Sequence, residues 1–135
     1  MESFPKISEY MDTSVPTLSP ETQIMAAVDF LLHHQVTGAP VVDSSGRLVG
    51  IITETDLLKL LTEGVQGEPA VEATVAEFMT TNVITVPPAV DIYYVAGMFL
   101  ANKFRRLPVV EDGKIVGAIT RYDLLRVVRS FSSMP

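Results

Sequence analysis

Several residue types that support catalysis or covalent cross-linking are absent or scarce in this 135-residue chain. Cysteine is absent, which excludes disulfide scaffolds, cysteine-based zinc sites and thiol catalysis. Histidine occurs twice, as the neighbours His33 and His34, and neighbouring side chains point to different faces, which favours a solvated pair over a metal site. No phosphate-loop glycine motif is present. Neither independent catalysis nor a resident metal ion is therefore expected.

Long apolar runs and a surplus of positive charge are missing as well. The longest apolar run, from Ile92 to Ala101, has about ten residues, and a membrane-spanning helix needs about 20. The first residues lack the basic and apolar stretches of a secretory signal. The net charge of −6 argues against a protein whose task is to hold DNA or RNA. We therefore expect a cytoplasmic protein with neither a nucleic-acid nor a membrane partner.

The residues that are present suit a folded chain with a sizeable core. Hydrophobic residues make up 47% of the chain and charged residues 19%, which allows one domain or two small ones that share a core. The charge is unevenly distributed. Residues 1–67 hold three bases and nine acids (3 − 9 = −6), and residues 68–135 hold seven of each (7 − 7 = 0). An anionic ligand is therefore expected to prefer the second half.

An internal repeat organises the chain. Residues 7–61 and 74–129 form two similar copies, which align at a shift of 68 that becomes 67 after one residue is lost in a turn. Identical pairs include Glu9 and Glu77, Met11 and Met79, Thr17 and Thr85, Pro40 and Pro108, Gly50 and Gly117, Thr53 and Thr120, and Asp56 and Asp123. Two copies are too few for a solenoid. The repeat predicts two similar subdomains, related by pseudo-twofold symmetry and joined by a linker at 62–73.

Each copy predicts the order helix, β, α, β, β, α. In the first copy these are a helix at 7–11, an extended piece at 15–18, a helix from Ser19-Pro20 that buries Ile24, Ala27, Val28 and Leu31, strands at 40–42 and 48–52, and a helix at 53–61. The second copy has a helix at 74–79, an extended piece at 83–86, a helix around Ile92, Val95, Ala96 and Phe99, strands at 108–110 and 115–119, and a helix at 120–128. Thr74 and Glu77 predict a capping box at the start of its first helix.

Each copy follows its last strand with a threonine and, three residues later, an aspartate. The pairs are Thr53 with Asp56 and Thr120 with Asp123. One interpretation is an ordinary helix start, with a hydroxyl at the N-cap and an acid in the first turn. The other is nucleotide binding, in which the hydroxyl and the helix N-terminus attract phosphate and the carboxylate accepts hydrogen bonds from a ribose diol. The two interpretations are compatible, and both stay open at this point.

In the order of its motifs the chain resembles the CBS domain family, named after cystathionine β-synthase, in the tandem form called the Bateman module. The resemblance covers residues 7–129 and rests on Glu9-Tyr10-Met11 and Glu77-Phe78-Met79, on the two Pro-Val-Val strands, and on the Gly-hydrophobic-x-Thr-x-x-Asp ends with their Asp-Leu-Leu continuations. It implies an α+β fold of two βαββα repeats packed sheet to sheet, usually within a homodimer. It also implies a cleft that commonly binds AMP, ADP, ATP or S-adenosylmethionine, with Mg²⁺ as a companion of ATP.

The same resemblance assigns roles to residues. Asp56 and Asp123 would hold ribose hydroxyls, Thr53 and Thr120 would hold ribose or phosphate, and Thr17 and Thr85 would lie beside the base. Pro40 and Pro108, at the starts of the Pro-Val-Val strands, also belong to the candidate set. Arg105 and Arg106 complete it, because members of the family often have a basic residue before this proline.

Basic residues distinguish the two candidate sites. Arg105 and Arg106 have no basic counterpart in the first copy, and Arg121 stands where the first copy has Glu54. A solvated basic helix end is one interpretation. A phosphate grip is the other, because arginine can contact phosphate through two parallel hydrogen bonds. We predict that the site with Thr120, Arg121 and Asp123 prefers a phosphorylated ligand, whereas the Thr53–Asp56 site is weaker, empty or suited to a less anionic ligand.

The leading prediction is a stand-alone regulatory module that senses an adenosyl ligand and acts on an unidentified protein through the conformation of a homodimer. The side chains expected in the core or at the dimer interface are Tyr93, Tyr94, Met98, Phe99, Met25 and Phe30. The alternative is a structural or protein-interaction pair whose clefts no longer bind a ligand. Two intact Thr-x-x-Asp elements argue against that alternative, and Glu54 argues for a partial loss.

Overall fold

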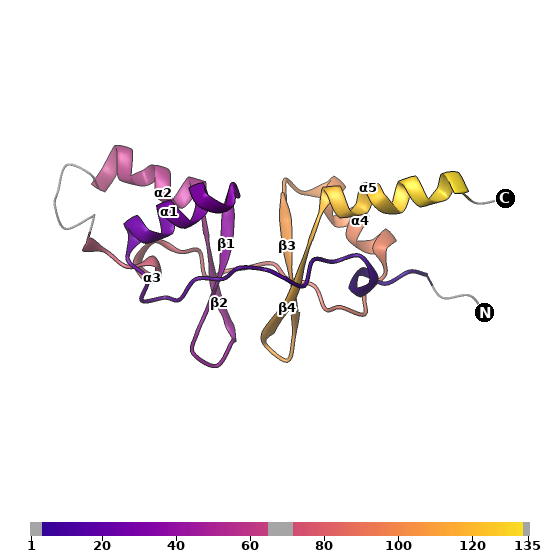
Figure 1. The fold of residues 1–135 in the computed structure, drawn as a ribbon, viewed down its shortest axis with the longest axis horizontal. Coiled ribbons are helices and arrows are strands. Elements are labelled where there is room, and N and C mark those ends of the chain that lie inside the picture. Colours follow the sequence, from indigo (N-terminus) through magenta and orange to yellow (C-terminus); the bar gives the residue numbers. More distant parts are fainter. Residues whose placement is uncertain (1–3, 65–71, 134–135) are drawn as a thin grey trace. The chain divides into compact units, whose positions relative to one another are not determined.

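The computed structural model describes residues 4–64 and 72–133, and these residues form two compact units (Figure 1). The first unit is Pro16–Val83, and the second combines the residues up to Val15 with those from Ile84 onward. Both units mix helices with a two-stranded antiparallel sheet, which confirms the predicted α+β class. The helices and strands recur in the same order in both copies, as the repeat requires.

The first unit contains the hairpin of β1 (Gly38–Val42) and β2 (Leu48–Thr53) with the helices α1 (Ile24–His34), α2 (Glu54–Lys59) and α3 (Val75–Phe78). A π-helical turn, Leu60–Gly64, extends α2. The core forms where one face of the hairpin meets the helices. Its buried side chains are Leu18, Ile24, Ala27, Leu31, Ala39, Val41, Ile52, Leu60 and Val75.

The second unit contains the hairpin of β3 (Arg106–Glu111) and β4 (Lys114–Thr120) with α4 (Ile92–Ala101) and α5 (Arg121–Ser130). Short 3-10 turns lie at Ile7–Glu9 and Phe131–Ser133. The core again lies between one face of the hairpin and the helices. Its buried side chains are Ile7, Val86, Ile92, Val95, Phe99, Leu107, Val109, Ile119 and Val127.

The compact units and the sequence repeats divide the chain differently, because each repeat begins with a segment that completes the other unit. Ile7 belongs to the first repeat, yet it is 0% exposed within the core of the second unit. Val75 belongs to the second repeat and is 0% exposed within the core of the first unit. These exchanged segments are residues 6–12 and 74–80. Each one also pairs with the second strand of the hairpin that it joins, at Asp12 with Ala118 of β4 and at Thr80 with Ile51 of β2.

Two glycines of the repeat allow these segments to approach. A Cβ atom on Gly50 would lie 2.6 Å from the Met79 sulfur and 3.0 Å from the Thr80 carbonyl oxygen. A Cβ atom on Gly117 would lie 2.7 Å from the Met11 sulfur and 2.8 Å from the Asp12 carbonyl oxygen. The repeated methionine and glycine therefore form one packing motif, because only a residue without a side chain leaves room for the incoming segment.

The helix predicted from Ser19-Pro20 begins later, at Ile24, and that prediction of its start was wrong. The Thr22 N–H donates to the Ser19 carbonyl oxygen at 3.1 Å, which closes a turn with Pro20 at its second position, where the fixed φ of proline is favourable. Gln23 then remains extended and pairs with Thr74 of the exchanged segment. The predicted capping box of Thr74 and Glu77 is confirmed, with the Thr74 N–H 2.7 Å from Glu77 Oε2.

The two hairpins differ in their turns, which explains the lost residue of the repeat. The second turn contains Asp112 and Gly113, both with positive φ (53° and 79°), as the shortest hairpin turns require. The first turn is longer and is held by Asp43 Oδ1, which accepts hydrogen bonds from the Ser45 N–H, the Ser45 hydroxyl and the Arg47 N–H at 2.7 to 3.0 Å. These hydrogen bonds, led by that of the Ser45 hydroxyl, lower the pKa of the Asp43 carboxyl.

Most of the predicted linker at 62–73 lies outside the described residues. Within the described ranges, the structure contains no helix that is long and apolar enough to cross a membrane.

Candidate functional site

The Thr53–Asp56 pair joins the end of β2 to the start of α2. Asp56 Oδ2 accepts hydrogen bonds from the Thr53 N–H at 2.9 Å and from the Thr53 hydroxyl at 3.0 Å. The other oxygen, Oδ1, accepts a hydrogen bond from the Thr80 hydroxyl at 3.3 Å. Thr80 reaches this carboxylate because its segment pairs with Ile51 on β2. Asp56 is 5% exposed. Its hydrogen-bond partners in the described part of the chain are neutral side chains and backbone.

The Thr120–Asp123 pair repeats this local geometry at the start of α5. Asp123 Oδ2 accepts hydrogen bonds from the Thr120 N–H at 2.9 Å and from the Thr120 hydroxyl at 3.0 Å. Its Oδ1 has a charged partner, because Arg126 Nη2 donates to it at 2.7 Å. The same Arg126 nitrogen donates to the Tyr10 carbonyl oxygen at 3.0 Å, on the exchanged segment. Asp123 is 8% exposed, so the two carboxylates are equally buried but differently partnered.

The residue that pairs with each threonine across its hairpin differs between the two units. Thr53 pairs with Gly38 in the β1–β2 hairpin, and Thr120 pairs with Arg106 in the β3–β4 hairpin. Paired residues share one face of a sheet. The threonine of the first unit therefore has no side chain beside it at this register, and that of the second unit has a guanidinium.

Arg106 lacks a full set of hydrogen-bond acceptors. Among the residues that the structure describes, its buried Nε has no hydrogen-bond partner, and its Nη2 lies 4.0 Å from Asp12 Oδ2, too far for a hydrogen bond. A buried N–H without an acceptor is unfavourable by about 1 to 3 kcal/mol. Arg106 therefore keeps donor capacity that no described residue satisfies, and its side chain is 24% exposed.

Arg121, which the sequence analysis assigned to a ligand, contacts the end of α4. Its Nη2 donates to the Phe99 carbonyl oxygen at 2.7 Å and to that of Asn102 at 3.2 Å, and its Nε donates to the Phe104 carbonyl oxygen at 3.2 Å. The guanidinium carbon also lies 5.6 Å from the centre of the Phe99 ring. Carbonyl groups at the end of a helix lack partners within it, so Arg121 acts as a side-chain cap of α4.

The remaining candidates adjoin the same strands. The Leu18 N–H, next to Thr17, donates to the Pro40 carbonyl oxygen at 3.0 Å. The Val86 N–H, next to Thr85, donates to the Pro108 carbonyl oxygen at 3.1 Å. Each threonine therefore lies one residue from a backbone contact with its own Pro-Val-Val strand. Arg105, which precedes Arg106, is exposed.

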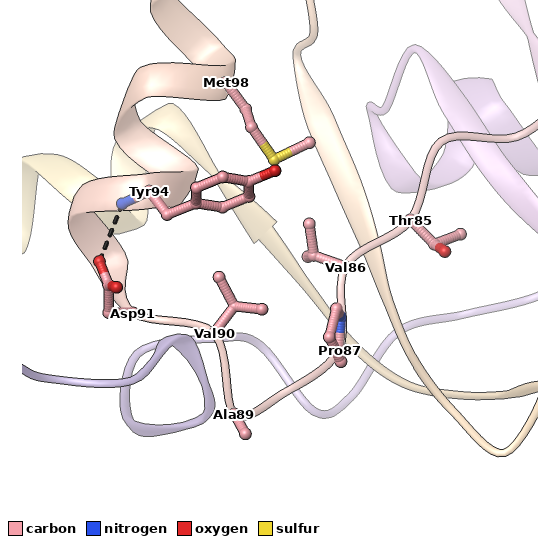
Figure 2. A pocket seen from close by; sticks show the side chains of 8 residues that line it. All are labelled: Thr85, Val86, Pro87, Ala89, Val90, Asp91, Tyr94 and Met98. Atoms are coloured by element: carbon pink, nitrogen blue, oxygen red, sulfur yellow. Dashed lines mark hydrogen bonds between the residues drawn. The ribbon is translucent and has the colours of Figure 1, made fainter.

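The second unit also has an open pocket of about 520 Å³, shown in Figure 2. The lining residues are Thr85, Val86, Pro87, Ala89, Val90, Asp91, Tyr94 and Met98. The Tyr94 ring lies along the α4 side of the pocket with its hydroxyl beside the Met98 sulfur, and Thr85 lies on the opposite side (Figure 2). Thr85, which was predicted to contact a ligand, lines this pocket, whereas Thr120 and Asp123 do not.

The histidines do not gather with other ligands. The His34 ring lies against Phe30, with ring centres 4.3 Å apart. In the part of the chain that the structure describes, no three His, Asp or Glu side chains are grouped so that they could hold a metal ion.

Sequence reasoning missed Arg126 and Thr80, the partners of the two carboxylates. The spacing of Arg126 from Asp123, three residues along a helix, could have indicated the ion pair. Thr80 is 24 residues from Asp56 and comes from the exchanged segment, so its contact had no local signal.

Comparison with known proteins agrees with this fold. The model of the family described as "CBS domain" matches the chain twice, over residues 7–63 and 75–130. The uncharacterized protein MJ1225 of Methanocaldococcus jannaschii is 32% identical over 124 residues, which cover 92% of this chain and 43% of that protein. The chain spans less than two thirds of the first curated relatives that it matches, with shares of 43%, 25% and 56%.

Two solved structures similar to this chain contain adenosyl compounds. The structure of Arabidopsis thaliana CBSX2 in complex with AMP has a TM-score of 0.83 and 30% identity, and the match covers 95% of this chain and 98% of that one. The structure of the CBS domain pair of protein MJ0100, in complex with methylthioadenosine and S-adenosyl-L-methionine, has a TM-score of 0.76 and 31% identity, with coverage of 91% and 98%.

Proposed function

The chain belongs to the CBS domain family as a tandem pair of CBS domains, and from this premise we propose that it is a regulatory module that binds an adenosyl ligand and has no catalytic activity of its own. The ligand is AMP, ADP or ATP, the last with Mg²⁺, and S-adenosylmethionine is the alternative. The AMP and S-adenosyl-L-methionine complexes of its structural relatives support this ligand class.

The observation that carries the proposal is the burial of Asp56 and Asp123. Both are helix-capping acids, but capping does not require burial, as the exposed Glu77 in the Thr74 capping box demonstrates. A buried carboxylate is unfavourable unless its oxygens are satisfied, and within residues 4–64 and 72–133 each Oδ1 accepts only one hydrogen bond. A ribose hydroxyl can supply the missing donor. We therefore propose Asp56 and Asp123 as ribose ligands, with Thr53, Thr120, Thr17, Thr85, Pro40 and Pro108 around them.

We propose Arg106 as the phosphate ligand, with Arg105 beside it. The Arg106 side chain supports this role, because it is 24% exposed and makes no hydrogen bond to any described residue. Gly38 at the equivalent register of the first unit offers no such donor. Arg121 contributes positive charge from its position on the α4 carbonyls. The Thr120–Asp123 site would then prefer a phosphorylated ligand, and the Thr53–Asp56 site, with Glu54 beside it, would prefer a less anionic one.

A melting-temperature panel with AMP, ADP, ATP, S-adenosylmethionine and NAD, each with and without Mg²⁺, tests the function. A ligand that binds only the native state stabilises it by about 2.7 kcal/mol at a concentration 100 times its Kd. D123A should remove most of the shift caused by a phosphorylated ligand. E77A is the matched control, because it removes an exposed capping acid outside the proposed site, and it should leave the shift unchanged.

Two outcomes would contradict the proposal. If no adenosyl ligand at millimolar concentration raises the melting temperature, the chain is a structural or protein-interaction module instead. If D56A abolishes the shift from phosphorylated ligands and D123A does not, the proposed order of the two sites is wrong.

We further propose that the chain acts as a homodimer whose conformation depends on the ligand. Leucines at equivalent positions are exposed in both units: Leu32 (71%) with Leu100 (83%), and Leu58 (57%) with Leu125 (59%). Exposed apolar side chains that recur on helices are typical of an interface. Tyr94 and Met25, 63% and 45% exposed, extend these apolar surfaces on α4 and α1. A second copy of the chain is the proposed occupant, and the regulated protein would respond to its arrangement.

The variant L100E/L125E tests the dimer, because two buried carboxylates would oppose its association. Sedimentation of the parent chain should give a dimer, and the variant should sediment as a monomer with an unchanged circular dichroism spectrum. A parent chain that sediments as a monomer at micromolar concentration would contradict the dimer while leaving ligand binding unaffected.

A further inference from the structure

Asp56 and Asp123, the two carboxylates proposed to bind ribose, differ in the hydrogen-bond partner of their Oδ1 oxygen. Asp123 Oδ1 accepts a 2.7 Å hydrogen bond from the cationic Arg126, whereas Asp56 Oδ1 accepts a 3.3 Å hydrogen bond from the neutral Thr80 hydroxyl. The residue equivalent to Arg126 in the first copy is Lys59, 67 positions earlier, and within the described ranges it forms no ion pair with Asp56. The local geometry of the carboxylates is the same, so the difference lies in these partners.

Arg126 is held at its position from two sides. Its Nη2 also donates to the Tyr10 carbonyl oxygen at 3.0 Å, on the exchanged segment that is anchored by the buried Ile7. The Arg126 side chain is 61% exposed, but the Asp123 side chain that it contacts is only 12% exposed, so one end of the ion pair is shielded from water. A ligand therefore meets Asp123 with the guanidinium already in place.

The partners also differ in chemistry. A hydroxyl donates and accepts hydrogen bonds and can rotate, so Thr80 can release Asp56 Oδ1 to one ribose hydroxyl and accept a hydrogen bond from the other. A guanidinium donates only. Oδ2 of Asp123 already accepts two hydrogen bonds and Oδ1 accepts one from Arg126, so a carboxylate with about four acceptor positions has one left.

From these contacts, and resting on the proposed function, we infer that Arg126 is a specificity-determining residue that makes Asp123 the acceptor of a single ribose hydroxyl. The Asp123 site then distinguishes ribose from 2′-deoxyribose weakly, because the 3′-hydroxyl, which both sugars carry, can fill the one position. The Asp56 site, with Thr80 as a second acceptor, engages both hydroxyls and rejects the deoxyribose. Arg126 acts here through Asp123, as a positioning residue.

Calorimetric titration with AMP and with 2′-deoxy-AMP measures the discrimination at each site, and D56A and D123A isolate the sites. The loss of one hydrogen bond to a charged group corresponds to a change in affinity of roughly 10-fold or more. In D123A, which retains the Asp56 site, the AMP to 2′-deoxy-AMP affinity ratio should be about 10 or more. In D56A, which retains the Asp123 site, the ratio should be near unity.

The decisive variants are made in the D56A background. R126M removes the donors but retains an unbranched, largely apolar stem, and it should raise the ratio about 10-fold because a second acceptor position becomes free. R126K restores a cationic donor and should return the ratio toward that of D56A alone. K59M in the D123A background is the matched control at the equivalent position, and it should not change the ratio.

The ratio, rather than the affinity, is the readout, because a general loss of structure would weaken both ligands alike. If R126M still binds AMP with an unchanged ratio, the inference is wrong and the proposed function stands. If the parent chain and all variants fail to bind AMP, the proposed function is wrong and the inference falls with it.

Discussion

The first and second units are built from the same repeat, yet they surround the same carboxylate with different charges. Asp56 has Thr53 and Thr80 as partners and Gly38 at the facing register, whereas Asp123 has Thr120, Arg126 and Arg106 in the equivalent surroundings. The threonine and aspartate are retained because the capping box that they form is local. The charges differ at Arg126, three residues further along the same helix, and at Arg106, which strand pairing brings to Thr120. A duplicated fold can thus keep one recognition element and vary its ligand preference through neighbouring positions.

The largest expected difference between the units comes from truncating Ile7 or Val75, the buried side chains that anchor the two exchanged segments. I7A creates a cavity in the core of the second unit and should destabilise it by about 2 to 5 kcal/mol. V75A removes less volume from the first unit and should be less destabilising, by about 2 kcal/mol. Hydrogen exchange of the β3–β4 and β1–β2 amides reports on each unit. The exchange of segments would be contradicted if I7A accelerated exchange in β1–β2 while leaving β3–β4 protected.

The next comparison concerns the glycines that admit these segments. G117A should destabilise the chain by about 1 to 3 kcal/mol, because the new methyl group meets the Asp12 carbonyl oxygen at 2.8 Å. Both new methyl groups also meet a flexible methionine sulfur, at 2.6 Å for Gly50 and 2.7 Å for Gly117. G50A should be less destabilising, because the rigid Thr80 carbonyl oxygen lies farther away, at 3.0 Å. Urea unfolding midpoints measure the difference, and equal midpoints for the two variants would contradict the explanation from backbone contact.

A third comparison separates the two interpretations of Arg121. If it caps α4, R121A should destabilise the chain by about 1 to 2 kcal/mol, a value reduced by the exposure of the side chain. R121K retains the charge without the planar fork and should recover only part of the loss. Thermal melting without ligand measures this effect. Unchanged stability of R121A, with a lowered affinity for AMP, would instead assign Arg121 to the ligand.

The smallest expected effect concerns the turns of the two hairpins. The pKa of Asp43 is lowered in the folded state, chiefly by the Ser45 hydroxyl, so this group stabilises the fold above its unfolded pKa and loses that contribution as pH falls through its folded pKa. D43N should therefore be slightly less stable than the parent chain at pH 7 and should approach it below pH 4. Urea midpoints between pH 7 and pH 3 test this. A constant difference across that range would exclude ionisation of Asp43 as the cause.

Several features were predictable because they depend on residues close in sequence. The Thr-x-x-Asp capping boxes, the Thr74–Glu77 box and the Pro-Val-Val strands were each expressed as short patterns, and the structure confirms their local geometry. The start of α1 was mispredicted, although Pro20 is a good first helical residue. The pairing of Gln23 with Thr74, 51 residues away, holds the chain extended until Ile24. Local propensity was overridden there by a contact that sequence spacing does not reveal.

The sequence by itself determined the duplication, the α+β class and the two capping carboxylates, because hydrophobic periodicity and capping act over one or two turns. Only the tertiary structure decided how these parts are partnered. It brought Tyr10 to Arg126 across 116 residues and Thr80 to Asp56 across 24, and it directed Arg121 to the carbonyls of α4. Such contacts depend on how segments pack, and two nearly identical local patterns can therefore acquire different chemistry.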